Sequence, residues 1–223
     1  EAQTVINSYG NGIRVYELQS ATTVDVNTNL THKPKVGVLD GNNEDIHIEI
    51  LESAGLVNDT HFEDDVEVSS LDGMSCFTFA SEPHEDDVSA SEISGVKAFV
   101  RSGGNFLAQC AAVRGYQDGA NGVRLFTNAG FVDEPGLGTF LYDNPTEPFA
   151  QFEGTIPDEG GSLEDFSFIT DPPGGTRIVH DSDNDFKTYV GRIDGFTGSA
   201  GGYVHYMGGH SYNDLDADRM YLN

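Results

Sequence analysis

The feature that most constrains this chain is an alternation of short apolar runs with longer segments that carry apolar residues at helical spacing. The first run, 35–40, reads KVGVLD, and two more follow at 76–80 and 105–109. The segments between them, 44–54 and 91–101, place apolar residues three or four positions apart. Strands that are apolar throughout are buried on both faces, and a strand–helix–strand order pairs them in parallel. We therefore predict an α/β fold with a mostly parallel central sheet flanked by helices.

The remaining segments add to this sheet. Within residues 1–34, two stretches at 12–18 and 22–27 alternate with period two, which predicts an N-terminal β arm packed on the domain. Residues 35–223 then form the α/β domain. The region 117–175 is richer in Gly, Pro, Asp and Asn, which predicts an elaboration at one end of the sheet. Further strands are expected at 176–180, 188–192 and 203–207.

The net charge of the chain limits the kinds of partner that it can bind. The 223 residues contain 11 Lys and Arg against 37 Asp and Glu, a formal charge of −26. Such a surface repels phosphate backbones, so we expect no nucleic-acid partner. No apolar stretch approaches the roughly 18 residues that span a bilayer, so we expect no membrane insertion. The acidity suits high salt or a calcium-containing exterior, and the chain opens on Glu1 without a signal sequence, which favours a processed protein that is extracellular or at the cell surface.

The residues that follow the strands are the first candidates for function. Ligands of an open parallel sheet gather beyond the carboxyl ends of its strands, so side chains there converge on one edge. The first three predicted strands are followed by a carboxylate, by a Glu and His, and by a Gln and Cys, and the last is followed by a His and Tyr. These candidates are Asp40, Glu82, His84, Gln109, Cys110, His210 and Tyr212.

Two of these segments also carry a family resemblance. Residues 103–112 read GGNFLAQCAA and residues 201–212 read GGYVHYMGGHSY. They resemble the two signature strands of the class I glutamine amidotransferase-like superfamily, and most of all its ThuA-like branch. With the first two predicted strands in the expected order, the similarity covers about residues 35–115 and 200–222. It implies a flavodoxin-like α/β scaffold.

The resemblance also implies roles for two residues. The nucleophile position of the superfamily falls on Cys110 and its histidine on His210. Ala108 and Ala112 stand where amidotransferases carry glycines beside the nucleophile. Tyr212 stands where they carry a glutamate after the histidine. Catalysis therefore does not follow from the resemblance.

Two interpretations of this edge stay open. If the chain is an enzyme, Cys110 is the nucleophile and His210 the base. Glu82, or alternatively Asp40, then replaces the missing carboxylate that orients the histidine. If it is not, Cys110 is a small buried hydrophobic residue and the edge is a ligand-binding rim. The rim residues are Asp40, His84, Gln109 and Tyr212.

One acidic run resembles the opening of a calcium loop. Asp181, Asp183 and Asp185 alternate with polar residues, and carboxylates at alternate positions can converge on one hard cation. The run lacks the glycine at its sixth place and the glutamate at its twelfth, which hold Phe186 and Arg192. The alternative is a solvated acidic surface. Calcium is the one cofactor that the sequence suggests.

These observations lead to three functional hypotheses. The first is a non-catalytic extracellular or cell-surface domain that serves binding or assembly of a surface structure, with its own copies or other surface proteins as partners. The second is a cysteine-dependent hydrolase or amidase. The third is a carbohydrate-acting protein, in which Tyr203, Tyr206 and Tyr212 line a sugar site.

Overall fold

The computed structural model divides the chain into two compact units, Glu1–Lys33 and Pro34–Asn223. In the first unit, β1 (Gln3–Ser8) pairs antiparallel with β2 (Arg14–Leu18). The strand expected at 22–27 lies outside the residues that the structure describes. Those residues are 3–8, 14–18, 35–71, 79–85, 87–118, 122–128, 130–135, 141–143, 161–170, 172, 174–195 and 200–209.

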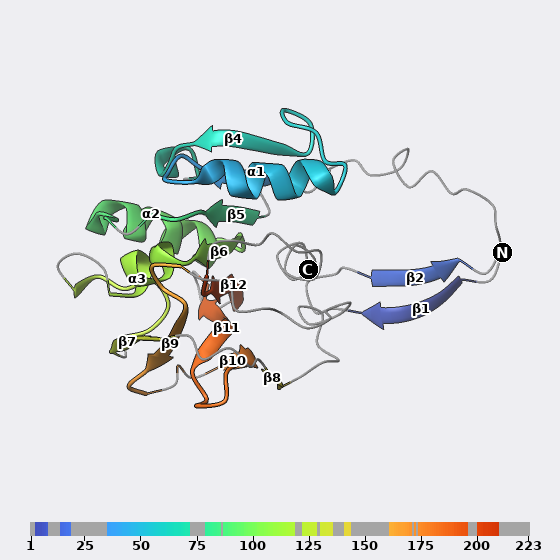
Figure 1. Ribbon diagram of the computed structural model, residues 1–223. Coiled ribbons are helices and arrows are strands. Elements are labelled where there is room, and N and C mark those ends of the chain that lie inside the picture. The colour runs from blue at the N-terminus through green and yellow to red at the C-terminus, as the bar shows by residue number, and fades with distance from the viewer. Residues whose placement is uncertain are drawn as a thin grey trace. The chain divides into compact units, whose positions relative to one another are not determined.

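The second unit is built on a ten-stranded sheet whose main path runs β4-β3-β5-β6-β12-β11-β10-β8 (Figure 1). The first five strands of this path pair in parallel with one another. In spatial order these are β4 (Phe62–Val66), β3 (Val36–Leu39), β5 (Phe79–Glu82), β6 (Asn105–Gln109) and β12 (Ala200–Met207). The other five pair antiparallel. They are β11 (Phe186–Asp194), β10 (Gly175–His180), β8 (Leu141–Tyr142), β9 (Asp165–Phe168) and β7 (Phe131–Glu134).

The prediction of a mostly parallel, flavodoxin-like sheet is therefore wrong. The sheet is mixed, and the described part of the second unit contains only three α-helices. The reason lies in the connections after β9. The link between β10 and β11 spans only 181–185, whereas a parallel crossover needs a dozen residues or more. Strands joined by so short a turn form an antiparallel hairpin, and this hairpin extends the sheet beyond β12.

Helices cover both faces of the parallel half of the sheet. Residues 44–54 were expected to be helical and form α1 (Glu44–Ser53), and 91–101 form most of α2 (Ala90–Arg101). Ser89 caps α2 by accepting a hydrogen bond from the Glu92 backbone N–H, and the Glu92 side chain accepts from Ser89 in return. The short α3 (Ala111–Gln117) and the 3-10 helix η2 (Val68–Leu71) complete the set. No helix within the described ranges is long and apolar enough to cross a membrane.

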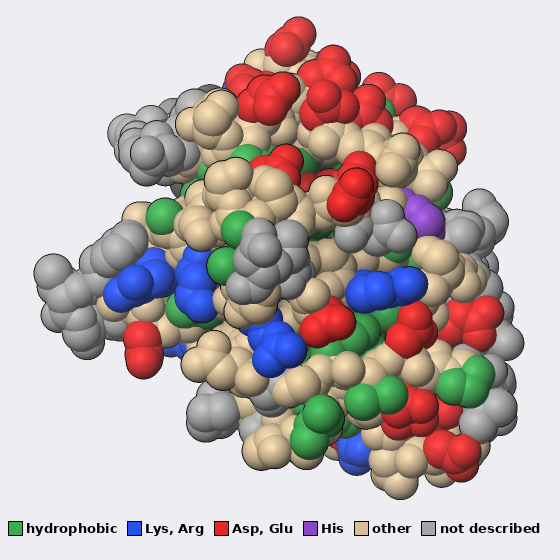
Figure 2. Space-filling model, turned by 90° about the vertical axis from the view of Figure 1, so that its left-hand side faces the viewer, with side chains coloured by type: hydrophobic (Ala, Val, Ile, Leu, Met, Phe, Trp, Pro, Cys, Tyr) green, Lys and Arg blue, Asp and Glu red, His purple; other side chains and the backbone are tan. Residues whose placement is uncertain are grey.

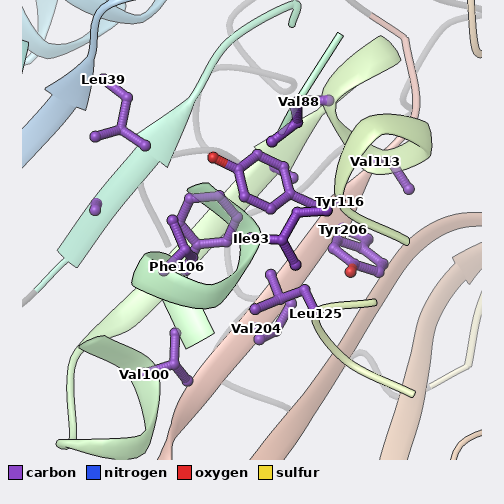
Figure 3. Packing of buried hydrophobic residues seen from close by; sticks show 14 of the residues in the cluster. Leu39, Val88, Ile93, Val100, Phe106, Val113, Tyr116, Leu125, Val204 and Tyr206 are labelled. Carbon is purple, nitrogen blue, oxygen red and sulfur yellow. The ribbon is translucent and has the colours of Figure 1, made fainter. Parts of the chain in front are cut away.

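The core has two layers because successive strand side chains point to opposite faces. On one face, Phe106 of β6 packs against Tyr116 of α3 with ring centroids 4.8 Å apart, and Ile93 of α2 lies beside them (Figure 3). On the other face, the neighbouring Leu107 packs in a cluster with Ile50 of α1. The sheet is thus held between α1 on one side and α2 with α3 on the other.

Candidate functional site

The carboxyl ends of the parallel strands bring the predicted residues to one edge. Asp40 follows β3, Glu82 ends β5, and Cys110 follows β6. Strands β4 and β5 point to the left in Figure 1, and Figure 2 looks onto that side. There carboxylates crowd the upper part of the face, at the height of α1 and β4, and further carboxylates lie lower, where the Lys and Arg side chains are.

Cys110 stands at a sharp turn between β6 and α3 with φ 50° and ψ −122°. Residues other than glycine rarely adopt this backbone conformation, which costs on the order of 1–3 kcal/mol. The turn is held on both sides, because the Cys110 N–H donates to the Met207 carbonyl at 2.8 Å and the Val113 N–H donates to the Cys110 carbonyl at 3.0 Å. The side chain is fully buried, at 0% exposure. A strained strand-to-helix turn of this kind is how nucleophile elbows present their reactive residue.

A serine connects this thiol to a histidine. The Cys110 Sγ lies 3.6 Å from the Ser162 Oγ, and the Ser162 Oγ lies 2.7 Å from His84 Nε2. Arg114 of α3 fixes the serine, since its Nη2 donates to the Ser162 carbonyl at 2.6 Å. The structure therefore joins two predicted residues, Cys110 and His84, through a third that the sequence did not reveal. Ser162 lies in the Gly- and Pro-rich insertion, and no motif there marks it.

The backbone that carries Ser162 is held against β11 and β12. The Gly209 N–H donates to the Leu163 carbonyl and the Gly208 N–H to the Lys187 carbonyl, both at 2.8 Å. A Cβ on Gly208 would lie 1.9 Å from the carbonyl oxygen of Glu164, so only glycine permits this approach. The glycine pair of the GGYVHYMGGHSY segment therefore helps to position Ser162. His210 and Tyr212, which follow directly, lie outside the residues that the structure describes. The predicted Cys110–His210 pair therefore also lies outside them.

Glu82 is buried at the end of β5. Its Oε2 accepts a hydrogen bond from the Tyr116 hydroxyl at 3.0 Å, and its buried Oε1 has no hydrogen-bond partner. Burial raises the pKa of Glu82 to about 8, although the Tyr116 hydrogen bond opposes this shift. The side chain is therefore mostly protonated at neutral pH, and Tyr116 is the partner that the structure gives it.

Gln109 lies in the interior next to His47 of α1. His47 Nε2 and Gln109 Oε1 are 2.7 Å apart, and both side chains are fully buried. Burial lowers the pKa of His47 to about 4, so the ring is neutral at pH 7. Because the Gln109 carbonyl can only accept, Nε2 carries the ring proton. This bond ties α1 to the strand that ends at Cys110, a role that the sequence did not indicate for His47.

An acidic cavity of about 290 Å³ opens beside Glu82. Its lining residues include no Lys, Arg or His. The carboxylates that line it are Asp40, Glu67, Glu82, Glu85, Asp87 and Glu92. Mutual repulsion disfavours this grouping unless protons or cations compensate for it.

Asp40, which lines this cavity, also belongs to a cluster of three carboxylates. Ligand oxygens of Asp40, Glu44 and Asp65 lie within 4.8 Å of one another. Burial raises the pKa of Glu44, and the charges of Asp65 and Asp40 raise it further, whereas a hydrogen bond from the Gly41 backbone lowers it. Sequence analysis named Asp40 but missed the other two, because they come from the start of α1 and from β4.

The predicted calcium run forms the turn between β10 and β11. The Asp181 Oδ1 accepts the backbone N–H of Asp183 at 2.8 Å and that of Asp185 at 2.9 Å. Burial raises the pKa of Asp185 to about 6, and the charges of Glu134 and Asp181 add to this shift. One oxygen of Asp181 thus organises the turn. Calcium binding by this run stays a prediction.

No protein-family model and no curated protein matches the sequence. Solved structures do match. A putative ThuA-like protein from Bacteroides uniformis aligns with a TM-score of 0.53 at 12% identity, over 86% of this chain and 88% of that one. The cold-adapted β-galactosidase from Rahnella sp. R3 aligns with a TM-score of 0.55 at 13% identity, and the GH42 β-galactosidase Gan42B with 0.50 at 12%. The chain spans 30% and 29% of the length of these two enzymes.

At such identities the likeness concerns the fold alone. The chain has a ThuA-like fold, so the resemblance read from the sequence is confirmed at that level.

Proposed function

We propose that the chain is a cysteine-dependent hydrolase in which Cys110 is the nucleophile and His84, acting through Ser162, is the base. The observation that carries this proposal is the strained conformation of Cys110 at the end of a hydrogen-bonded chain of three reactive side chains. A cysteine that only filled space would gain nothing from φ 50°, since glycine adopts it without the same cost.

The chain of hydrogen bonds supports a balanced acyl-transfer reaction. The thiol proton of Cys110 passes to Ser162 Oγ as the serine proton passes to His84 Nε2, and the sulfur bonds to the carbonyl carbon of an amide or ester. As the C–N or C–O bond breaks, the proton returns through the same chain to the leaving group. Water then adds to the acyl carbon of the thioester and the C–S bond breaks, so that the acid product leaves and one proton of the water restores the thiol.

Membership of the class I glutamine amidotransferase-like superfamily is part of this proposal. The ThuA-like fold supports it, and the resemblance puts the nucleophile of that superfamily at Cys110. His84 supplies a base from the end of β5, where the family pattern has it at His210.

A non-catalytic binding domain is the second candidate. Its support is the complete burial of Cys110, because a nucleophile must be reached by substrate. The methyl groups of Ala108 and Ala112, which are both buried at this turn, agree with it. With this candidate we also propose an extracellular or cell-surface location. The same holds for the partners that the acidity suggests.

The carbohydrate hypothesis has less support. Two of the structural neighbours are β-galactosidases by name. However, Tyr206 is fully buried and donates to Gln117 at 3.1 Å, so it belongs to the core. Tyr203 is half-buried, with the Arg192 guanidinium 4.7 Å from its ring centre.

Alkylation of the native chain tests the catalytic proposal. Iodoacetamide modification would be followed at each cysteine by mass spectrometry, with Cys76 as the internal reference. We expect Cys110 to react in the folded chain, and Ser162→Ala and His84→Ala to slow it by about tenfold or more. Ser94→Ala, an exposed serine of α2, is the matched control and should leave the rate unchanged.

The opposite result would favour the second candidate. If Cys110 reacts only when the chain unfolds, it is a structural residue and the site is non-catalytic. If it reacts in the folded chain but His84→Ala has no effect, His84 is not the base.

A further inference from the structure

A pocket of about 330 Å³ opens at the edge of the sheet that lies opposite Cys110. Arg101 ends α2 just before β6 begins, whereas Cys110 follows the other end of that strand. Asp194 ends β11, which runs antiparallel to β12 and therefore reaches the same edge as Arg101. We propose that this pocket binds a small organic anion, whose carboxylate or phosphate group lies between Lys97 and Arg101. This inference is independent of any reaction at Cys110.

The charges that line this pocket are opposite in balance to those of the chain as a whole. The chain has 11 Lys and Arg against 37 Asp and Glu. Among the described residues that line the pocket, three are cations and one is a carboxylate. The cations are Lys97, Arg101 and Arg192, and the carboxylate is Asp194. The pocket is therefore a place where this acidic protein presents positive charge to a ligand.

Lys97 and Arg101 lie on one face of α2, because residues four positions apart are neighbours on a helix. Like charges at this spacing repel each other. Burial lowers the pKa of Lys97, and the charge of Arg101 lowers it further. Both effects disfavour the charged ammonium group. An anion bound between the two side chains would instead stabilise both charges.

Backbone carbonyls hold these two side chains in place without neutralising their charges. Lys97 Nζ donates to the Arg124 carbonyl at 2.9 Å, and Arg101 Nε donates to the Asp194 carbonyl at 3.2 Å. An ammonium group has three N–H donors, and Lys97 makes no ion pair within the described ranges, so it can also donate to a ligand. Hydrogen bonds from such a cation to a carboxylate or phosphate are about twice as strong as neutral ones.

The apolar part of the lining indicates that the anion carries an organic body. It consists of Phe126, Pro172 and Ile193, of which the last two are buried. The Phe126 ring meets Tyr206 edge to face at 6.1 Å between centroids, and a Cβ on Gly191 would lie 1.9 Å from its Cζ, so glycine leaves the room that this ring fills. Pockets for small molecules typically measure about 300–1,000 Å³, so this one suits a small body.

The other two charged residues act less directly. Arg192 donates from Nε and Nη2 to the Gly201 carbonyl at 3.3 and 3.1 Å, and its guanidinium lies 4.7 Å from the ring centre of Tyr203. Its side chain therefore holds the start of β12 while its charge adds to the potential of the pocket. Asp194 is exposed, and its carboxylate opposes the binding of an anion. Removing that charge should therefore tighten binding.

Calorimetric titration of the full chain with sodium benzoate and with phenyl phosphate tests the proposal. A salt concentration of about 0.15 M screens carboxylates that lie farther than about 8 Å from the pocket. We expect one site with a dissociation constant of about 1 mM or lower for at least one of the two anions. Either result supports the proposal, and the tighter anion identifies the head group.

Four variants locate the site. Lys97→Gln and Arg101→Gln should each weaken binding by about tenfold, because each removes a charged donor. Asp194→Asn should tighten it by about threefold and keeps the backbone carbonyl that holds Arg101. Lys35→Gln is the matched control, since Lys35 pairs with Glu63 and does not line this pocket, and it should bind as the wild type does.

Four outcomes would overturn the proposal. They are no saturable binding of either anion, equal affinity for the uncharged benzyl alcohol, binding that neither Lys97→Gln nor Arg101→Gln weakens, and an equal loss in Lys35→Gln. Inorganic phosphate that binds as tightly as phenyl phosphate would contradict the organic body. Thermal unfolding of each variant provides the folding control. If Lys97→Gln or Arg101→Gln does not fold, the other variant and the gain expected in Asp194→Asn still decide.

Discussion

Replacing Glu82 by glutamine should change how the stability of this protein depends on pH. Burial raises the pKa of Glu82 from 4.5 to about 8. Between these values the folded chain keeps a proton that the unfolded chain has lost, so the folded state binds more protons. Its stability therefore falls as pH rises from 4.5 and levels off above about pH 8.

The size of the effect follows from the two pKa values. Each pH unit between them costs about 1.36 kcal/mol, so the free energy of unfolding loses up to about 5 kcal/mol over the whole interval. Glutamine cannot ionise but can still accept the hydrogen bond from Tyr116, so Glu82→Gln should lack this loss. The variant should be the less stable protein near pH 5, where its amide lacks an acceptor, and the more stable one at pH 8.

Urea unfolding at a series of pH values, with chelator and fixed salt, measures this difference. Subtracting the variant curve from the wild-type curve removes the contribution of His47, whose lowered pKa acts in the opposite direction. Glu49→Gln, an exposed position of α1, is the matched control and should leave the shape of the curve unchanged. If the difference between wild type and Glu82→Gln stays constant within about 1 kcal/mol from pH 5 to 9, Glu82 does not carry the buried proton.

Three further substitutions test single structural features by thermal or urea unfolding. Cys110→Gly should be about 1 kcal/mol more stable than Cys110→Ala because it relieves the positive φ, and the reverse order would show that the turn is unstrained. Gly208→Ala should lower the free energy of unfolding by about 3 kcal/mol, because its methyl group would overlap the Glu164 carbonyl, and it should also uncouple Ser162 from Cys110. A melting temperature like that of the wild type would contradict that close approach. Asp181→Ala removes the acceptor of two backbone hydrogen bonds and should lower the free energy of unfolding by about 3 kcal/mol, whereas Asp181→Asn should lower it less. Equal losses in the two variants would mean that the carboxylate oxygen does not hold the turn.

The elements were predictable where local patterns determine them. Apolar periodicity placed the helices near 44–54 and 91–101 and the strand at 105–109, because burial of one helix face or of a whole strand leaves a regular trace in the sequence. The rule that ligands lie beyond strand ends also found Asp40 and Glu82 before the sheet was known. The sheet as a whole was predicted wrongly, because the sequence pattern of a strand does not say which neighbour it pairs with.

The candidate site depended more on tertiary structure. Cys110, Ser162 and His84 come from three separate segments, and no sequence spacing relates the serine to the other two. The same holds for Glu44 and Asp65, which a β-bulge and a helix start bring to Asp40.

The sequence by itself determined the charge, the positions of most strands and helices, and the type of residue at each strand end, since these depend on composition and on neighbours along the chain. Only the tertiary structure decided the antiparallel half of the sheet, the contacts of Cys110 and the protonation of Glu82. Hydrogen bonds and ion sites need atoms within a few ångströms of each other, and a pKa depends on how far burial removes a group from water. Both are properties of distances through space, which the order of residues along the chain does not specify.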